Sequence, residues 1–203
     1  MLELQCWHAT CFGYCMDNRA LWAAAAVVGC GVLMDDARAQ GDWDVVLNGR
    51  SIHMNAAKEW NEDNWGLGIE REFDTGSRWV KVAVANGFKD SLGEPSYMAG
   101  GGVKRRFRLV SDDFYVDLGV IAFLMTRDDV KNNQPFPGVL PAMTVGGKRI
   151  AVNFTYLPGS VVDRVTSARL RDPQLDGVLF IQLKLDASLF GVGGRRQLFA
   201  GSD

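Results

Sequence analysis

The chain has 203 residues, a length typical of a single domain. Its 22 Lys and Arg residues are balanced by 24 Asp and Glu residues, which argues against nucleic-acid binding as the main function. A hydrophobic content of 47% excludes a disordered chain, and no apolar run reaches the ~20 residues that a membrane-spanning helix needs. A transmembrane β-barrel stays compatible with this composition, because its strands alternate in polarity.

The N-terminal region has the pattern of a secretory signal peptide. Arg19 precedes an apolar stretch that runs from Ala20 to Met34, and an Ala-Arg-Ala sequence ends at Ala39. This pattern predicts residues 1–39 to be an N-terminal extension and signal that is cleaved after Ala39, with export from a bacterial cytoplasm. Two other interpretations remain open, a lipobox with a lipidated Cys30 and a buried N-terminal helix.

Phe114–Met125 is the clearest predicted β-strand, because its two faces differ in character. Residues 114, 116, 118, 120, 122 and 124 are all apolar. The opposite face mixes the Asp117 carboxylate and Gly119 with Tyr115 and the bulky apolar residues Ile121, Phe123 and Met125. A soluble sandwich turns its polar face to water, so we interpret the wholly apolar face as the one that meets lipid. The mixed face is then expected to line an interior.

Seven further segments have strand-like patterns bounded by turn residues. They are residues 49–54, 65–73, 79–88, 96–108, 139–146, 149–156 and 178–185. Eight strands form the smallest common outer-membrane barrel. The sequence therefore predicts an all-β fold, an eight-stranded antiparallel up-and-down transmembrane β-barrel over residues 40–185. A short N-terminal helix or extension precedes it, and residues 186–203 form a C-terminal tail.

The lengths of the connections alternate between short and long. Short turns at one end and long loops at the other are typical of outer-membrane barrels. In an up-and-down barrel every odd-numbered connection lies at the same end. His53 precedes the first connection, Asp90 and Ser91 lie in the third, and Arg127 and Asp128 lie in the fifth. We therefore expect these five residues on one rim, the extracellular one if both termini are periplasmic.

Three of these rim residues carry the chemistry of acyl transfer or hydrolysis. Taken alone, His53 at a strand end and Asp90 and Ser91 in a loop are ordinary structural residues. Together they supply a base, a carboxylate and a hydroxyl. The remaining chain offers no evident metal site, since all four cysteines lie at or before Cys30 and His8 is the only other histidine. We expect no metal and no cofactor.

Prolines and glycines mark two further features of the predicted barrel. Pro141 lies in one strand and Pro158 follows the next, and proline cannot donate to a strand ladder. They are either loop punctuation or the borders of a lateral slot through which a lipid tail enters. Gly100, Gly101 and Gly102 lie within one strand, where they form either a bulge or space for an acyl chain.

Four stretches of this sequence resemble the PagP family of outer-membrane phospholipid:lipid A palmitoyltransferases. They are WNEDNWG at 60–66; FKDS, EP and AGGG within 88–102; DLG, TRD, PFPGVLP and VG within 117–146; and TYLPG at 155–159. The similarity covers roughly residues 50–185, and the spacing of the third stretch makes it fairly specific.

The resemblance implies that His53, Asp90 and Ser91 are catalytic. We expect His53, aided by Asp90, to activate an acceptor hydroxyl on lipid A, with Ser91 acting at the phospholipid ester. Substrate-binding residues are implied as well. Arg127 with Asp128 matches the outer-surface site, Pro141 and Pro158 match a lateral gate, and Gly102 matches the floor of a palmitoyl-length pocket.

The sequence departs from the family pattern in several places. The loop after His53 is short, so the basic residues that would bind the lipid A headgroup have no clear counterpart. Only residues 41–47 remain for the amphipathic N-terminal helix that the family implies. The segment Ser160-Val161-Val162 lacks the gating tyrosine, and the chain continues past Leu185.

The predicted function is the transfer of a palmitoyl chain from a glycerophospholipid to lipid A. The expected partners are lipopolysaccharide, the phospholipid donor and the outer membrane, with the site on the outer surface of a monomer or homodimer. Two alternatives remain open. A lipid A deacylase or phospholipase would use the same residues with water as acceptor, and a non-catalytic barrel would have a polar interior.

Overall fold

The structure is a computed structural model that describes residues 41–109, 114–130, 133–166 and 170–191. The predicted signal peptide, its cleavage site and the lipobox cysteine lie outside the described residues, as does the predicted tail from residue 192 onward.

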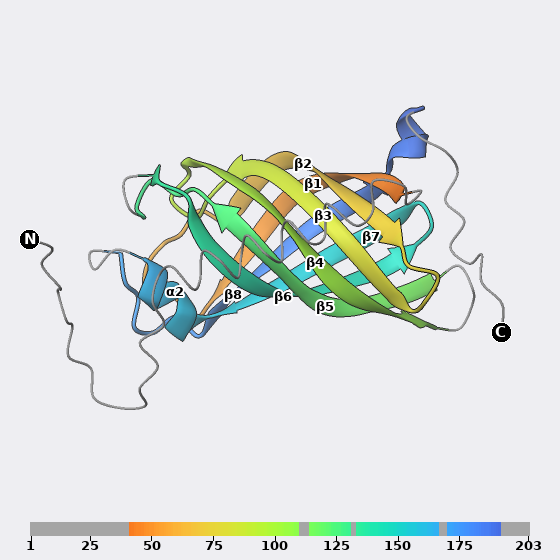
Figure 1. The fold of residues 1–203 in the computed structure, drawn as a ribbon. Coiled ribbons are helices and arrows are strands. Elements are labelled where there is room, and N and C mark those ends of the chain that lie inside the picture. The colour runs from red at the N-terminus through yellow and green to blue at the C-terminus, as the bar shows by residue number, and fades with distance from the viewer. Residues whose placement is uncertain (1–40, 110–113, 131–132, 167–169, 192–203) are drawn as a thin grey trace, which may run out of the picture.

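Eight antiparallel strands close into a barrel in sequence order, with β8 paired to β1 (Figure 1). The strands are β1 (Gly41–Met54), β2 (Asp63–Asp74), β3 (Trp79–Lys89), β4 (Pro95–Arg108), β5 (Phe114–Met125), β6 (Phe136–Gly147), β7 (Ile150–Pro158) and β8 (Gly177–Asp186). The predicted up-and-down barrel is therefore confirmed. Because the topology is up-and-down, the first, third, fifth and seventh loops all lie at the end where helix α2 (Gly159–Val165) is drawn (Figure 1).

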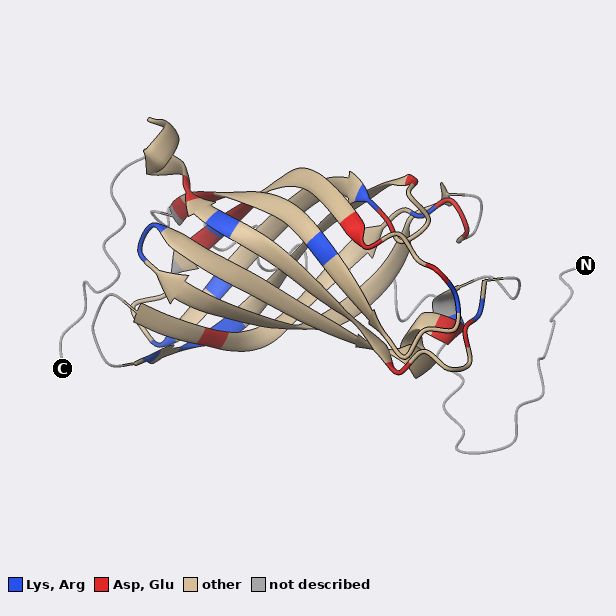
Figure 2. Ribbon diagram, turned by 180° about the vertical axis from the view of Figure 1, so that it is seen from behind, with Lys and Arg blue, Asp and Glu red and all other residues tan. Residues whose placement is uncertain are grey.

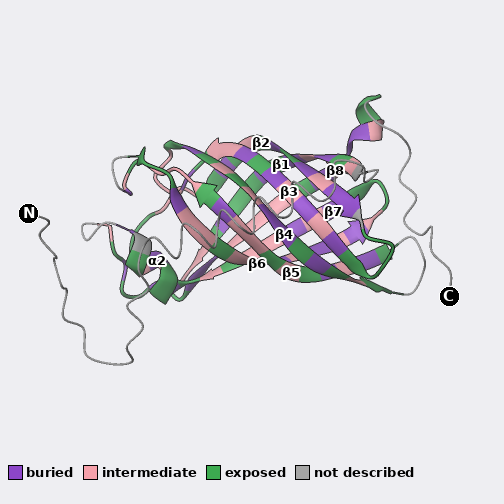
Figure 3. Ribbon diagram, in the orientation of Figure 1, coloured by how far each residue is buried: buried purple, intermediate pink, exposed green. Residues whose placement is uncertain are grey.

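Burial alternates along the strands, as a barrel with one lipid-facing surface requires (Figure 3). In β5, Tyr115, Asp117 and Phe123 are buried, whereas Leu118 and Leu124 are exposed. The predicted assignment of the two faces is thus confirmed. Among the residues that the structure describes, no helix has the length and apolarity needed to cross a membrane.

The expectation of an N-terminal helix at residues 41–47 is wrong, because these residues form the first half of β1. They pair with β2 in register from Gly41 opposite Phe73 to Leu47 opposite Leu67. Asp44 turns inward, and its carboxylate lies 3.1 Å from Lys184 Nζ on β8. This inward charge breaks the polar–apolar alternation that would otherwise have marked a strand.

The ladder between β6 and β7 is incomplete at the α2 end. The strands are paired over four positions, from Met143 opposite Phe154 to Gly146 opposite Ala151. Toward α2, β6 continues to pair with β5 and β7 continues to pair with β8, but the register contains no β6–β7 pair there. Pro141 and Pro158 both lie in the unpaired parts. The missing hydrogen bonds expected at these prolines are confirmed, and their use by a lipid stays a proposal.

Part of the connection between β7 and β8, which the sequence predicts to be a loop, forms a helix. The seven-residue helix α2 begins directly after Pro158. Val162 of α2, Leu175 and Val178 form a small buried cluster, and Ala56, Leu157 and Phe180 pack against it. The α2–β8 segment therefore packs against the loop at residues 55–62 that follows β1.

Candidate active site

The interior of the barrel divides into a charged half and a largely apolar half. The charged half lies close to the start of β1 and the end of β8, where Figure 2 shows most of the charged segments of the strands. Its side chains, here called the ion cluster, are Asp44, Glu70, Glu72, Lys104, Arg106, Asp117 and Lys184. The chain therefore fills this part of the bore with its own charges.

Lys184 is the cation at the centre of the ion cluster. Its Nζ lies 2.7 Å from Glu70 Oε1 and 3.1 Å from Asp44 Oδ2, and it also bonds Glu72. The carboxylates of Asp44, Glu70 and Glu72 are close enough together to hold a metal ion. The Lys184 ammonium occupies that position, so the ion cluster has the character of a structural network.

Lys104 and Arg106 complete the ion cluster from β4. Lys104 Nζ donates to Glu70 Oε1 at 2.8 Å and to Thr144 Oγ1 at 3.1 Å. The Arg106 guanidinium donates to both oxygens of Asp117 at 2.9 and 2.7 Å. The cluster is internally bonded, which compensates much of the cost of burying its charges.

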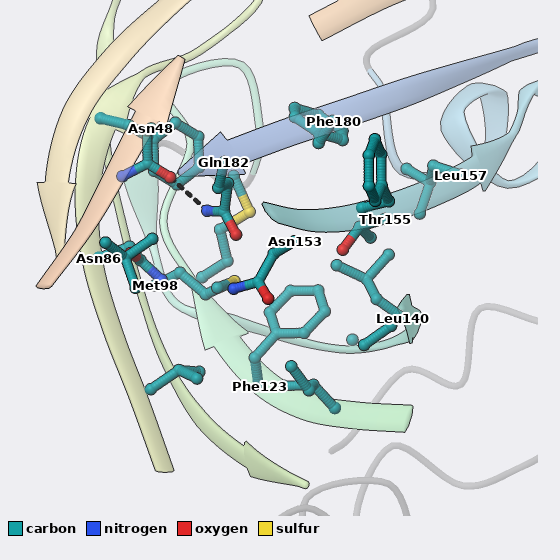
Figure 4. A pocket seen from close by; sticks show the side chains of 18 of the residues that line it. Asn48, Asn86, Met98, Phe123, Leu140, Asn153, Thr155, Leu157, Phe180 and Gln182 are labelled. Atoms are coloured by element: carbon teal, nitrogen blue, oxygen red, sulfur yellow. Dashed lines mark hydrogen bonds between the residues drawn. The ribbon is translucent and has the colours of Figure 1, made fainter. Parts of the chain in front are cut away.

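A cavity of about 280 Å³ occupies the other half of the bore (Figure 4). Its wall is largely apolar, and Met98, Phe123, Leu140, Leu157 and Phe180 are drawn around it. The three residues predicted to line an apolar interior, Ile121, Phe123 and Met125, do line it, as does Val161 of α2. Toward the ion cluster the lining becomes polar, with Asn48, Glu70, Lys104, Thr144, Asn153 and Gln182.

The unpaired segments of β6 and β7 form one wall of this cavity. Pro137, Gly138, Val139 and Leu140 line it from β6, and Thr155 and Leu157 line it from β7. In Figure 4, Leu140 and Thr155 lie on the facing strands at this wall. The position where the ladder is interrupted is therefore also the position where the cavity approaches the lipid-facing side of the barrel.

His53 and Ser91 meet at the α2 end of the barrel. His53 is the second-last residue of β1, and its Nε2 lies 3.0 Å from the Oγ of Ser91 in the β3–β4 loop. The His53 side chain is only 4% exposed. An imidazole and a hydroxyl at hydrogen-bond distance form the base–hydroxyl pair that acyl chemistry uses. The predicted gathering of these two residues on one rim is therefore what the structure shows.

The carboxylate nearest to the His53 imidazole is that of Glu62, a residue that the sequence analysis did not single out. Glu62 Oε1 accepts a hydrogen bond from the His53 backbone N–H at 3.0 Å and lies 3.7 Å from Nδ1. The bond from the His53 backbone holds the pKa of Glu62 below its ordinary value, with a further contribution from Arg50. Glu62 lies within the WNEDNWG stretch, but only the spatial contact indicates its relation to His53.

The Asp90 carboxylate is bound within its own loop, and its expected assistance to His53 stays a prediction. Its Oδ1 accepts from the backbone N–H groups of Leu92 and Glu94 at 2.8 and 3.1 Å, which fixes the loop that carries Ser91. Its Oδ2 accepts from the Ser96 hydroxyl at 3.3 Å and lies 3.5 Å from Arg127 Nε. In this structure the carboxylate beside the imidazole is therefore that of Glu62, and Asp90 supports the Ser91 loop.

Arg127 and Asp128 both follow β5 and lie on the same rim, as expected, but the carboxylate bound to Arg127 is that of Asp129. Arg127 Nε donates to Asp129 Oδ1 at 3.0 Å and faces Asp90. Asp128 is exposed. Of the two neighbouring carboxylates, the turn that follows β5 brings Asp129 against the guanidinium, a choice that the sequence pattern alone does not reveal.

His53 and Ser91 lie beside the cavity and are not among its lining residues. Two lining residues contact neighbours of this pair: Arg50 contacts Glu62, and Arg127 faces Asp90. Two cations therefore lie close to the catalytic candidates, and they are suited to bind a phosphate or another anion there.

Gly102 lies on the inward face of β4, between Met98 of the cavity wall and Lys104 of the ion cluster. It is not among the residues that line the cavity. A Cβ at Gly102 would lie 2.1 Å from the carbonyl oxygen of Val120 on β5. A side chain here would collide with the neighbouring strand before it reached the cavity. The lining residues at the inner end of the cavity are the polar ones next to the ion cluster.

We compared the sequence with known protein families and with curated proteins. The family model described as "Antimicrobial peptide resistance and lipid A acylation protein PagP" matches residues 33–165. This chain belongs to the PagP family. The predicted family resemblance is thereby confirmed.

Three curated relatives of the PagP family carry the name Lipid A acyltransferase PagP. The protein from Bordetella parapertussis is 30% identical over 150 residues, which cover 70% of this chain and 79% of the relative. The protein from Bordetella pertussis Tohama I is 31% identical over 127 residues, covering 59% and 69%. The protein from Methylobacillus flagellatus is 29% identical over 133 residues, covering 62% and 71%.

Proposed function

We propose that this protein transfers a palmitoyl chain from a glycerophospholipid to a hydroxyl of lipid A, in the outer membrane and at its outer surface. The observation that carries the proposal is the His53–Ser91 pair at the rim beside a largely apolar cavity. The names of the PagP relatives support lipid A as the acceptor. We expect the protein to act as a monomer or homodimer.

The donor acyl chain enters the cavity through the side of the barrel. Between the unpaired parts of β6 and β7, near Pro141 and Pro158, no ladder of hydrogen bonds has to break for a lipid tail to pass. Inside, the chain contacts the apolar wall around Phe123, Leu140 and Phe180. The ester is then held near the rim, where Arg50 and Arg127 can contact the phosphate of the donor or of lipid A.

The transfer itself uses the His53–Ser91 pair. The lipid A hydroxyl oxygen bonds to the carbonyl carbon of the donor ester, and His53 takes the hydroxyl proton. When the ester bond breaks, this proton passes to the oxygen of the departing lysophospholipid. Ser91 acts at the ester, and the Glu62 carboxylate stabilises the imidazolium that forms. Asp90 contributes by holding the Ser91 loop and Arg127.

Glu62 offers a direct test of this arrangement. E62Q keeps an oxygen that can accept from the His53 backbone N–H but removes the negative charge beside Nδ1. We expect kcat for acyl transfer to fall about tenfold or more, with the fold unchanged. D63N, which neutralises the neighbouring exposed carboxylate, is the matched control. Full activity in E62Q would exclude Glu62 from the mechanism.

Chain-length selection can be tested at Val84. This buried residue lines the cavity and lies opposite Glu70 in the β2–β3 register. V84F shortens the space for the acyl chain, so palmitoyl transfer should fall by about tenfold or more and shorter chains should become preferred. V103F makes the same change on the outer face of β4 and should leave chain preference unaltered. Equal chain preference in both variants would show that this part of the cavity does not hold the chain.

The proposal is tested with the purified full chain in vesicles that contain lipid A and a phospholipid with a labelled palmitoyl chain. Label that moves to lipid A supports transfer. Label released as free fatty acid indicates the hydrolytic alternative, in which water is the acceptor. Label that stays in the phospholipid indicates a non-catalytic barrel.

A further inference from the structure

One buried carboxylate at the rim has no part in the mechanism described above. Asp172 lies between α2 and β8 and is 2% exposed. It lies beyond residues 33–165, the part of the chain that matches the family model.

The Asp172 carboxylate binds the loop at residues 55–62. Its Oδ2 accepts from the backbone N–H groups of Ala57 and Lys58 at 2.9 and 3.0 Å, and the indole Nε1 of Trp60 lies 3.4 Å away. Its Oδ1 accepts from the backbone N–H of Gln174 at 3.2 Å. Several donors converge on one anion, an arrangement in which each hydrogen bond is strengthened by the charge.

These hydrogen bonds favour the ionised form of the Asp172 carboxyl. Burial raises the pKa of this carboxyl, but the hydrogen bonds from Lys58, Trp60, Gln174 and Ala57 more than offset that effect and hold it below its ordinary value. Asp172 is therefore ionised at neutral pH.

Trp60 connects this carboxylate to the candidate catalytic histidine. The indole ring stacks on the His53 imidazole, with ring centroids 5.4 Å apart and planes inclined by 10°. The same imidazole also contacts Ser91, whose Oγ lies 3.0 Å from His53 Nε2. Rotation of the imidazole away from Ser91 is thus opposed by a ring that Asp172 helps to hold.

The α2–β8 segment is itself tied to the barrel, so it can act as a fixed support. The Asp172 N–H donates to Asp163 Oδ1 of α2 at 3.3 Å. Leu175 and Val162 are buried together with Val178 of β8. Val161 of α2 also lines the cavity.

We propose that Asp172 is a positioning residue for acyl transfer: its carboxylate fixes the loop at residues 55–62 and holds Trp60 against His53, so that Nε2 faces Ser91. The proposal rests on the proposed function for its catalytic consequence. Its structural part, the orientation of His53, is independent of which reaction the protein performs.

The test combines kinetics with NMR of the full chain labelled at histidine. The chain contains two histidines, His8 and His53, and H53N assigns the His53 signals. In the wild type, the stacked indole should displace the ring-proton signals of His53. In D172A this displacement should diminish, and kcat should fall about ten- to a hundredfold while KM changes little.

Three further variants sharpen the result. W60F keeps a stacking ring but removes the indole N–H, and D172N keeps one acceptor oxygen without the charge, so kcat should fall less in both than in D172A. D176N changes a neighbouring exposed carboxylate that binds the Asn55 side chain. D176N should leave the His53 signals and kcat unaltered.

Each outcome decides the proposal. Unchanged His53 signals in folded D172A would overturn it, whether or not kcat falls, because the carboxylate would then not act through the imidazole. If D172A does not fold, D172N is compared with the wild type instead, and unchanged His53 signals in D172N overturn the proposal. A wild-type protein that is inactive in the assay, but whose His53 signals respond to D172A, would contradict the proposed function and leave the positioning of His53 supported.

Discussion

H53A should fold into the same barrel and transfer acyl chains about 10²–10⁴-fold more slowly than the wild type, because it lacks the base that takes the proton of the acceptor hydroxyl. S91A should show a comparable loss if Ser91 acts at the ester. Both residues lie at the rim, outside the ion cluster, so neither replacement removes a contact that closes the barrel. Initial rates with labelled phospholipid and lipid A measure the effect.

Two controls make this prediction specific. S160A removes an exposed hydroxyl from α2 and should keep full activity. Circular dichroism and resistance to protease confirm that each variant is folded. A folded, fully active S91A protein would remove Ser91 from the site, and a folded, fully active H53A protein would remove the proposed mechanism altogether.

K184M should destabilise the barrel by about 3–5 kcal/mol, the cost of breaking a buried ion pair by removing one partner. Lys184 Nζ contacts Asp44, Glu70 and Glu72, which would be left buried with fewer cations around them. Urea unfolding of the protein in detergent or lipid measures the change in the free energy of unfolding. E70Q/K184M should recover part of the loss, because it also removes one of the uncompensated negative charges.

The exposed Lys148 in the β6–β7 turn provides the matched control for this prediction. K148M removes the same type of charge at the surface and should change stability by no more than about 0.5 kcal/mol. Equal unfolding midpoints for K184M and the wild type would show that the ion cluster contributes nothing to stability beyond filling the bore.

The strands of the barrel were predictable from sequence wherever the polar–apolar alternation was intact. β5 is the clearest case, because its outer face is wholly apolar and only its inner face carries a charge. The first half of β1 was not predictable in this way. Its inward Asp44 is compensated by Lys184 on β8, and a contact between residues so far apart in sequence leaves no local signal.

The sequence predicted which residues of the candidate site share a rim, because the up-and-down topology determines this. The parity of the connections places His53, Ser91, Asp90 and Arg127 on one rim, and the structure brings His53 and Ser91 to 3.0 Å. Parity says nothing about which carboxylate meets the imidazole. The short loop after β1 brings the Glu62 carboxylate next to His53. The Asp90 carboxylate instead accepts hydrogen bonds from backbone N–H groups of the β3–β4 loop.

Two features of the molecule could not be predicted from strand patterns. The ion cluster draws single charges from β1, β5 and β8 and two each from β2 and β4, and most of these residues look like isolated polar positions in their own strands. Asp172 lies in a loop without periodicity, and its contacts with Ala57, Lys58 and Trp60 depend on how the α2–β8 segment packs. Both features depend on contacts between distant parts of the chain.

The most direct test is mass spectrometry of lipid A from Gram-negative cells that produce the wild-type protein, H53A or neither. We expect lipid A to gain one palmitoyl chain with the wild type and to remain unmodified with H53A at equal protein level in the outer membrane. Lipid A that loses an acyl chain, or that is the same in all three cell populations, would contradict the proposed acyl transfer.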